Sequence, residues 1–418
     1  MAQIGQPQSS LWHHQGFLLL WSGQSISQLG SQVTTWALPL TAIVLLKATA
    51  GQMGLLVAVR NVSYLLIGLF AGAWVDRVKR RPLLIVTDIG RALLLGTIPV
   101  TALLGHLSMM QLYIVTFFTG LLAVLFDVAY QSFLPSLVAR DQLVEGNSKL
   151  EASVAMAGIT GPGLAGVLVQ LLTGPIAILA DALSFVVSAL SLVGIHVEES
   201  PPIIEEKRHI WTEIGEGLRA VLHYPIIRTL AVGSGLFNFF DSLLLTVYAL
   251  YLTKTLGVTP LLVGIIIAIS SIGGLIGALL AARVTRAVGL GPALLGGVLL
   301  ASIAECIIAS ASGPFLFAVL LVIIGEASVQ AGAVLYGINA LSLRQAIVPD
   351  RLQGRVSATL RIISVGVVPF GAILGGFLGD TYGLRTTVFI AGGGTLLAFL
   401  WVLFSPVRHL KEQSKSDE

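Results

Sequence analysis

Long apolar stretches separated by short polar gaps recur along the whole chain. A helix that crosses the hydrocarbon core of a bilayer needs about 20 mostly apolar residues. Because 55% of the 418 residues are hydrophobic and 11% are charged, the chain would expose too much apolar surface if it folded in water. The sequence predicts an all-α membrane protein with about twelve transmembrane helices, whose apolar cores are residues 17–46, 53–74, 83–104, 112–130, 154–172, 176–195, 230–252, 262–282, 293–311, 315–340, 360–378 and 387–404.

Basic residues are distributed unevenly between the gaps. Lys47, Lys254 and Arg385 are the only lysines and arginines after odd-numbered helices, whereas nineteen lie in the remaining gaps and the C-terminal tail. Loops that stay in the cytoplasm carry the excess of lysine and arginine. We therefore expect a multi-pass protein of the cell membrane with both termini in the cytoplasm. The same bias explains the net charge of +3 without a nucleic-acid partner.

The longest connection separates six predicted helices from six. Its second half, residues 211–222, has apolar residues at helical spacing, which indicates an amphipathic helix on the cytoplasmic face. The predicted domains are an N-terminal six-helix bundle over 1–196, a linker over 197–228, a C-terminal six-helix bundle over 229–408 and a cytoplasmic tail over 409–418.

The two halves also share a short sequence pattern. Gln131-Ser-Phe-Leu-Pro135 follows the fourth helix, and Gln345-Ala-Ile-Val-Pro349 follows the tenth. Internal duplication of this kind is typical of secondary transporters, which bind their substrate near the midplane between the repeats. We therefore expect two pseudo-symmetric bundles around a central cavity.

The most specific local motif lies between the second and third helices and reads Gly72-Ala-Trp-Val-Asp76-Arg77-Val-Lys79-Arg80-Arg81. A glycine permits close approach of helices, and an acid at a helix end can pair with a basic group or with another helix's N-terminus. A basic loop that only fixes the topology is the alternative interpretation.

This motif resembles the G-x-x-x-D-R-x-G-R-R loop of the major facilitator superfamily, with Lys79 in place of the second glycine. The resemblance covers nearly the whole chain and is closest to the branch that contains enterobactin exporters and macrolide-efflux proteins. It implies the major facilitator fold and a conformational latch, to which Gly72, Asp76, Arg77, Arg80 and Arg81 belong. It continues through Thr87-Asp88-Ile-Gly-Arg91, Phe126-Asp127-Val-Ala-Tyr-Gln131, Asp181-Ala-Leu-Ser-Phe185 and Asn339-Ala-Leu-Ser-Leu-Arg344-Gln-Ala-Ile-Val-Pro-Asp-Arg351.

Four further candidates, one for the latch and three for helix packing, lie in later helices. Asp127 lies near a cytoplasmic helix end, where we expect it to join the latch network. Gly161, Pro162 and Gly166 belong to a stretch of small residues in the fifth helix that allows close helix packing. This stretch resembles the G-P-x-x-G-G element of facilitator antiporters, which favours export by antiport; ordinary small-residue packing is the alternative.

Ionisable residues within the hydrocarbon are costly and therefore mark functional candidates. Asp241 lies within the seventh helix, Glu326 within the tenth, and Arg60 near the middle of the second. By the resemblance, helices one, four, seven and ten line the central cavity, so both acids are candidates for substrate binding or proton coupling. Arg60 is a candidate counter-ion, with a structural ion pair as the alternative. Glu305, in the ninth helix, is expected to be peripheral.

Polar side chains at helical spacing support the same cavity. Gln24, Gln28 and Gln32 share one face of the first helix, which lipid would disfavour and a water-filled cavity would accept. Asn238 lies one turn before Asp241, and Gln330 lies one turn after Glu326. These residues complete the predicted substrate and coupling site.

The sequence lacks the signature patterns of two classes of enzyme. The phosphate-binding pattern G-x-x-x-x-G-K-[ST] and the zinc pattern H-E-x-x-H do not occur, and Cys306 is the only cysteine. We expect no enzymatic activity, cofactor or metal, and a monomer whose partners are lipid, protons and a small-molecule substrate. The predicted function is secondary active export of an amphipathic drug, macrolide or siderophore by proton antiport; an importer or uniporter of the same fold is the alternative.

Overall fold

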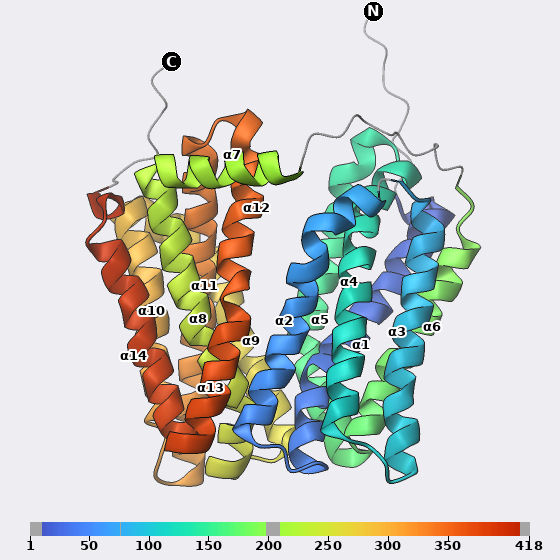
Figure 1. The fold of residues 1–418 in the computed structure, drawn as a ribbon, viewed down its shortest axis with the longest axis horizontal. Helices are drawn as coiled ribbons and strands as arrows, with labels where there is room; N and C mark the ends of the chain where they lie inside the picture. Colours follow the sequence, from blue (N-terminus) through green and yellow to red (C-terminus); the bar gives the residue numbers. More distant parts are fainter. Residues whose placement is uncertain (1–10, 76, 198–209, 410–418) are drawn as a thin grey trace, which may run out of the picture. The chain divides into compact units, whose positions relative to one another are not determined.

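The computed structural model describes residues 11–75, 77–197 and 210–409, and every regular element among them is a helix (Figure 1). Short 3-10 or π-helical segments flank the long helices: η1 (Leu11–His13), η2 (Arg140–Gln142), η3 (Tyr251–Thr255) and η4 (Pro406–His409). The α-helices are α1 (Gln15–Val44), α2 (Ala50–Val75), α3 (Arg80–Leu103), α4 (Met109–Leu137), α5 (Leu143–Leu171), α6 (Gly174–Gly194), α7 (Ile210–His223), α8 (Pro225–Leu250), α9 (Pro260–Val288), α10 (Leu290–Ala309), α11 (Phe315–Ile347), α12 (Asp350–Gly366), α13 (Val368–Tyr382) and α14 (Leu384–Leu403).

Eleven helical segments of the described chain are long and apolar enough to cross a membrane. Three of them join adjacent elements: η2 with α5, α8 with η3, and α12 with α13. The first helix, α1, is not among the eleven although its 30 residues exceed the length of a crossing. Its glutamine, serine and threonine residues lower its hydropathy. The same glutamines form the polar face that the sequence predicts for this helix.

The observed helices extend beyond several predicted cores. The fifth helix begins at Leu143 rather than at residue 154, and α11 continues to Ile347 rather than ending at residue 340. The predicted eleventh helix is divided, because α12 ends at Gly366 and Pro369 lies in the first turn of α13. Apolar length reports the part of a helix within the hydrocarbon, whereas polar helix ends project past it.

Two compact units make up the described chain. Unit 1 comprises Met1–Thr41 and Leu66–Glu205, and unit 2 comprises Ala42–Leu65 and Glu206–Glu418. The end of α1 and the first half of α2 belong to unit 2, whereas the second half of α2 belongs to unit 1. The predicted domain boundaries stay a prediction. The predicted pseudo-symmetry of the bundles stays a prediction.

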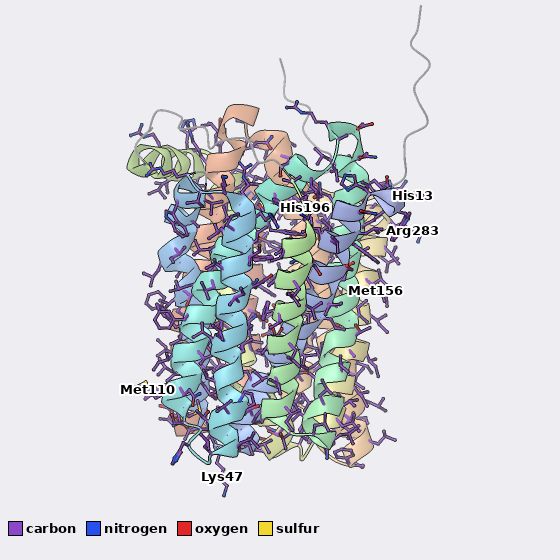
Figure 2. The ribbon with its side chains drawn as sticks, turned by 90° about the vertical axis from the view of Figure 1, so that its right-hand side faces the viewer. His13, Lys47, Met110, Met156, His196 and Arg283 are labelled. Carbon is purple, nitrogen blue, oxygen red and sulfur yellow. The ribbon has the colours of Figure 1, made fainter. Side chains whose placement is uncertain are left out.

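Unit 1 is built around apolar side chains from several helices. Phe17, Leu84, Phe133 and Leu192 are buried together in one apolar cluster. Large apolar side chains also cover its exterior, such as Leu93 (69% exposed) and Leu190 (65% exposed), as expected for helices that face lipid. Figure 2 shows Met110 at one end of this unit and His13 and His196 at the other, so its helices run from end to end.

Unit 2 contains the predicted amphipathic helix. Figure 1 shows α7 lying across the ends of α8 and α12, and it packs on both. Ala220 and Val221 of α7 are buried with Ile227 and Val356, whereas Leu218 and Leu222 are exposed. Glycines with positive φ, Gly289 (89°) and Gly383 (88°), form the tight connections before α10 and α14.

Candidate functional site

A pocket of about 220 Å³ opens between α8, α10 and α11 in unit 2. Two glycines in its lining bring α10 and α11 into contact, because a Cβ atom on Gly297 would lie 2.8 Å from the carbonyl oxygen of Gly332 and 3.0 Å from the backbone nitrogen of Tyr336. The backbones of α10 and α11 therefore touch at these glycines. Val298 and Ala333 complete the small-residue part of the lining.

Aromatic and polar side chains line the rest of this pocket. Phe237 and Tyr336 supply aromatic surface, and Ser234 and Asn238 supply polar atoms. The hydroxyl groups of Ser234 and Tyr336 are 3.1 Å apart and share a hydrogen bond. Asn238 donates its Nδ2 to the carbonyl oxygen of Ser234 at 2.8 Å, which holds the amide at the pocket wall. Such a mixture suits an amphipathic ligand with flat apolar parts.

The two predicted carboxylates of unit 2 lie near each other. Asp241 and Glu326 are half-buried and interact electrostatically, although they come from different helices, α8 and α11. Gln330 donates its Nε2 to Glu326 Oε1 at 3.3 Å, as their one-turn spacing predicts. Their roles in transport stay predictions.

Glu305 is a third acid of this group, and its position corrects an expectation from the sequence. Its side chain is 0% exposed and interacts electrostatically with Asp241 and Glu326, so it is not peripheral. Thr395 donates its hydroxyl to Glu305 Oε2 over 3.4 Å, whereas Oε1 has no hydrogen-bond partner among the described residues. The sequence did contain a signal for Glu305, because it lies within an apolar run. A carboxylate there is costly on any face of the helix, which marks it as a functional candidate.

The predicted polar face of α1 is divided by the structure. Gln24 is 3% exposed and donates to Ser188 Oγ at 2.8 Å, so its amide is used inside unit 1 instead of facing a cavity. Gln28 and Gln32 are half-buried. Helical spacing gives the common face of these residues, but a neighbouring helix covers part of that face.

Gln24 joins a buried charged network. Ser188 donates to Asp88 Oδ2 at 2.6 Å, and Asp88 Oδ1 forms an ion pair with Arg91. The Arg91 guanidinium lies between two aromatic rings, 4.4 Å from the centre of Phe126 and 4.1 Å from that of Phe185. This network links α1, α3, α4 and α6 within unit 1.

The structure describes only some residues of the predicted latch. Asp76 lies outside the described residues, and Gly72 lies in the last turn of α2. Arg77 and Asp127 are exposed, Arg80 is half-buried, and Asp127 interacts electrostatically with Arg91. A conformational role for these residues stays a prediction.

Arg81 has a structural contact within unit 1. It donates to the carbonyl oxygens of Leu192 (2.9 Å) and Val193 (2.6 Å) at the end of α6. Carbonyl groups in the last turn of a helix lack their usual intrahelical partners, and the helix dipole favours a cation there.

Gly161, Pro162 and Gly166 are buried within α5, which continues as a helix through the proline. A Cβ atom on Gly161 would collide with the Cβ atom of Gln32, so the glycine allows α1 and α5 to touch.

Arg60 lies in the half of α2 that belongs to unit 2, with an exposed side chain. Its pairing with an acid stays a prediction.

Similar proteins extend over most of the chain. The model of the Major Facilitator Superfamily matches residues 20–361 and residues 230–418. The multidrug efflux pump Tap of Mycolicibacterium fortuitum is 31% identical over 88% of this chain and 88% of that protein. The enterobactin exporter EntS of Citrobacter koseri is 23% identical over 97% of this chain and 95% of that protein.

Two solved structures share the fold at low sequence identity. An inward-facing bacterial homologue of the iron transporter ferroportin has a TM-score of 0.76 and 17% identity, over 95% of this chain and 99% of that one. The nucleoside transporter NupG has a TM-score of 0.71 and 11% identity, over 93% and 98%. Together with the eleven candidate spans, these matches show that this chain is a multi-pass membrane protein that belongs to the Major Facilitator Superfamily.

Proposed function

We propose that this transporter exports small amphipathic molecules of the drug, macrolide or siderophore class across the cell membrane by proton antiport with alternating access. The observation that carries the proposal is one pocket with aromatic and polar walls in the same unit as three mutually interacting acids. The names of the relatives, a multidrug efflux pump and an enterobactin exporter, support export. We further propose that the protein acts as a monomer with both termini in the cytoplasm.

Proton coupling is proposed from the physics of the acid group. Burial in a low dielectric disfavours the charged form of a carboxylate, and like charges held close together disfavour it further. Asp241, Glu305 and Glu326 therefore cannot all be charged at low cost. We assign the coupling protons to Asp241 and Glu326, which are half-buried and can exchange with water, while Glu305 is enclosed.

The test compares driven and passive transport in vesicles that contain the full chain. Asp241→Asn and Glu326→Gln should lose efflux driven by a proton gradient while retaining exchange without a gradient, because a neutral amide cannot carry the proton. Ethidium, erythromycin and a catecholate siderophore are the probes. Glu145→Gln is the control, because Glu145 forms an exposed ion pair with Lys149.

The direction and coupling ion are decided by the same assay. Normal uphill efflux by the Asp241→Asn/Glu326→Gln double variant would contradict the proton role of both acids and favour a uniporter. Accumulation in place of efflux would favour an importer of the same fold.

A further inference from the structure

The first turn of α2 is held by a carboxylate from α13, 330 residues away in the chain. Asp380 Oδ1 accepts a hydrogen bond from the Ala50 backbone nitrogen at 2.9 Å. Its Oδ2 accepts from the Gly51 backbone nitrogen at 2.9 Å and from the Thr49 hydroxyl at 3.1 Å. The first N–H groups of a helix lack partners within the helix, and its dipole attracts negative charge there. One carboxylate thus satisfies two of these donors.

The contact between α2 and α13 continues from this turn. A Cβ atom on Gly376 would lie 2.7 Å from the Ala50 carbonyl oxygen and 2.9 Å from Gly51 Cα, so the two backbones touch. Lys254 donates its ammonium to the carbonyl oxygen of Ala48 at 2.9 Å. All of these residues belong to unit 2.

A third contact lies near the point where α2 changes unit. The guanidinium of Arg361 in α12 lies 4.7 Å from the centre of the Tyr64 ring. Leu65 is the last residue of α2 in unit 2, and Leu66 is the first in unit 1. Alternating access moves one repeat of a transporter against the other. Such movement must either bend α2 near Leu65 or release its first half from α13.

The chemistry of the contact is suited to release. Asp380, Thr49 and Lys254 carry its polar part, and Asp380 is exposed, so water can replace its hydrogen bonds when the helices separate. Where the two backbones touch, the contact is made by glycine and alanine residues.

We propose that Asp380 is a latch residue whose carboxylate holds the first turn of α2 on α13 in this conformation and must release it in each transport cycle. The contact lies at the opposite end of α2 from the Gly72–Arg81 motif and is separate from it. The proposal rests on the proposed alternating-access function, but one of its two tests needs no transported substrate.

The first test measures access to the contact. Met53, one turn into α2, is 2% exposed. In a Cys306→Ser background, Met53→Cys should react slowly with a maleimide. Adding Asp380→Asn should raise the rate about tenfold, because it removes the charge that holds the turn and populates an open minor state. Asp141→Asn, another exposed acid, is the control and should leave the rate unchanged.

Thermal unfolding of the same variants separates opening from misfolding. If Asp380→Asn keeps the parent melting temperature and labels faster, the latch is supported. Equal labelling rates in Asp380→Asn and its parent would overturn the proposal, and so would faster labelling that appears only with a lowered melting temperature.

The second test prevents release with a disulfide. Thr49→Cys/Asp380→Cys should lose ethidium efflux upon oxidation and regain it upon reduction. Thr285→Cys/Asn339→Cys is the matched control, because these residues share a 2.7 Å hydrogen bond between α9 and α11, where no separation is expected. Undiminished efflux with the 49–380 disulfide formed would overturn the latch. Absence of ethidium efflux from the parent would instead count against the proposed substrate class, and the labelling test would still decide the latch.

Discussion

Two buried carboxylates show how the same chemical group can serve different purposes. Asp88 is fully buried, and both of its oxygens are bonded, one to Arg91 and the other to Ser188. Glu305 is equally buried, but it has one long hydrogen bond and a second oxygen without a partner among the described residues. We therefore predict a structural role for Asp88, and we predict that Glu305 acts on transport through its interaction with Asp241 and Glu326.

This contrast predicts opposite outcomes for two conservative substitutions. Asp88→Asn should lower the free energy of unfolding by about 3 kcal/mol, because it leaves the Arg91 charge without its ion-pair partner. Glu305→Gln should leave the melting temperature near that of the parent, because the amide keeps the shape and adds a donor, and it should alter proton-driven efflux. Thermal unfolding in detergent and vesicle transport measure the two effects. Equal loss of stability in both variants would show that Glu305 is structural.

Helices in this protein meet at glycines. Gly161 allows α5 to touch α1, and Gly297 and Gly332 allow α10 to touch α11 beside the pocket. Between helices in lipid, close van der Waals packing replaces the hydrophobic driving force that operates in water. A glycine therefore matters where a neighbouring backbone approaches, and not merely because it is part of a small-residue motif.

Two glycines of α5 provide a matched test. Gly161→Ala should lower the free energy of unfolding by about 1–3 kcal/mol, because the new Cβ atom collides with Gln32 Cβ. Gly158→Ala should be neutral or stabilising by up to about 1 kcal/mol, because no atom lies within 4 Å of its Cβ position and alanine favours the helix. Thermal unfolding of both variants checks this. Equal effects would mean that helix propensity, rather than packing, controls this segment.

At the scale of the whole molecule, the ends of unit 1 should face different compartments. Unit 1 has exposed apolar side chains along its helices, and His106 and His196 lie exposed in gaps of opposite predicted orientation. The excess of basic residues after even-numbered helices predicts that His196 faces the cytoplasm and that His106 faces the outside.

Cysteine labelling of intact cells tests this orientation. In a Cys306→Ser background, His106→Cys should react with a membrane-impermeant maleimide, because its gap faces the outside. His196→Cys should react only after the cells are permeabilised. Reaction of His196→Cys in intact cells would reverse the proposed orientation.

The sequence by itself determined the number and approximate position of the long helices, because bilayer thickness sets how many consecutive residues must be apolar. It also singled out Asp241, Glu326 and Gln330 as candidates, since a charged or amide group within such a stretch is costly and therefore noticeable; their roles stay predictions. The family resemblance was readable from motifs spread over the chain, and the family matches confirmed it.

Only the tertiary structure decided which of these groups meet. Glu305 and Gln24 were assigned to the wrong surroundings, and Asp380 was not singled out, although it lies beside the first turn of α2. Helical periodicity gives the face on which a side chain lies, but it contains no information about the element that covers that face. The partners come from helix packing, which depends on where backbones approach at glycines such as Gly376, and on contacts between residues hundreds of positions apart.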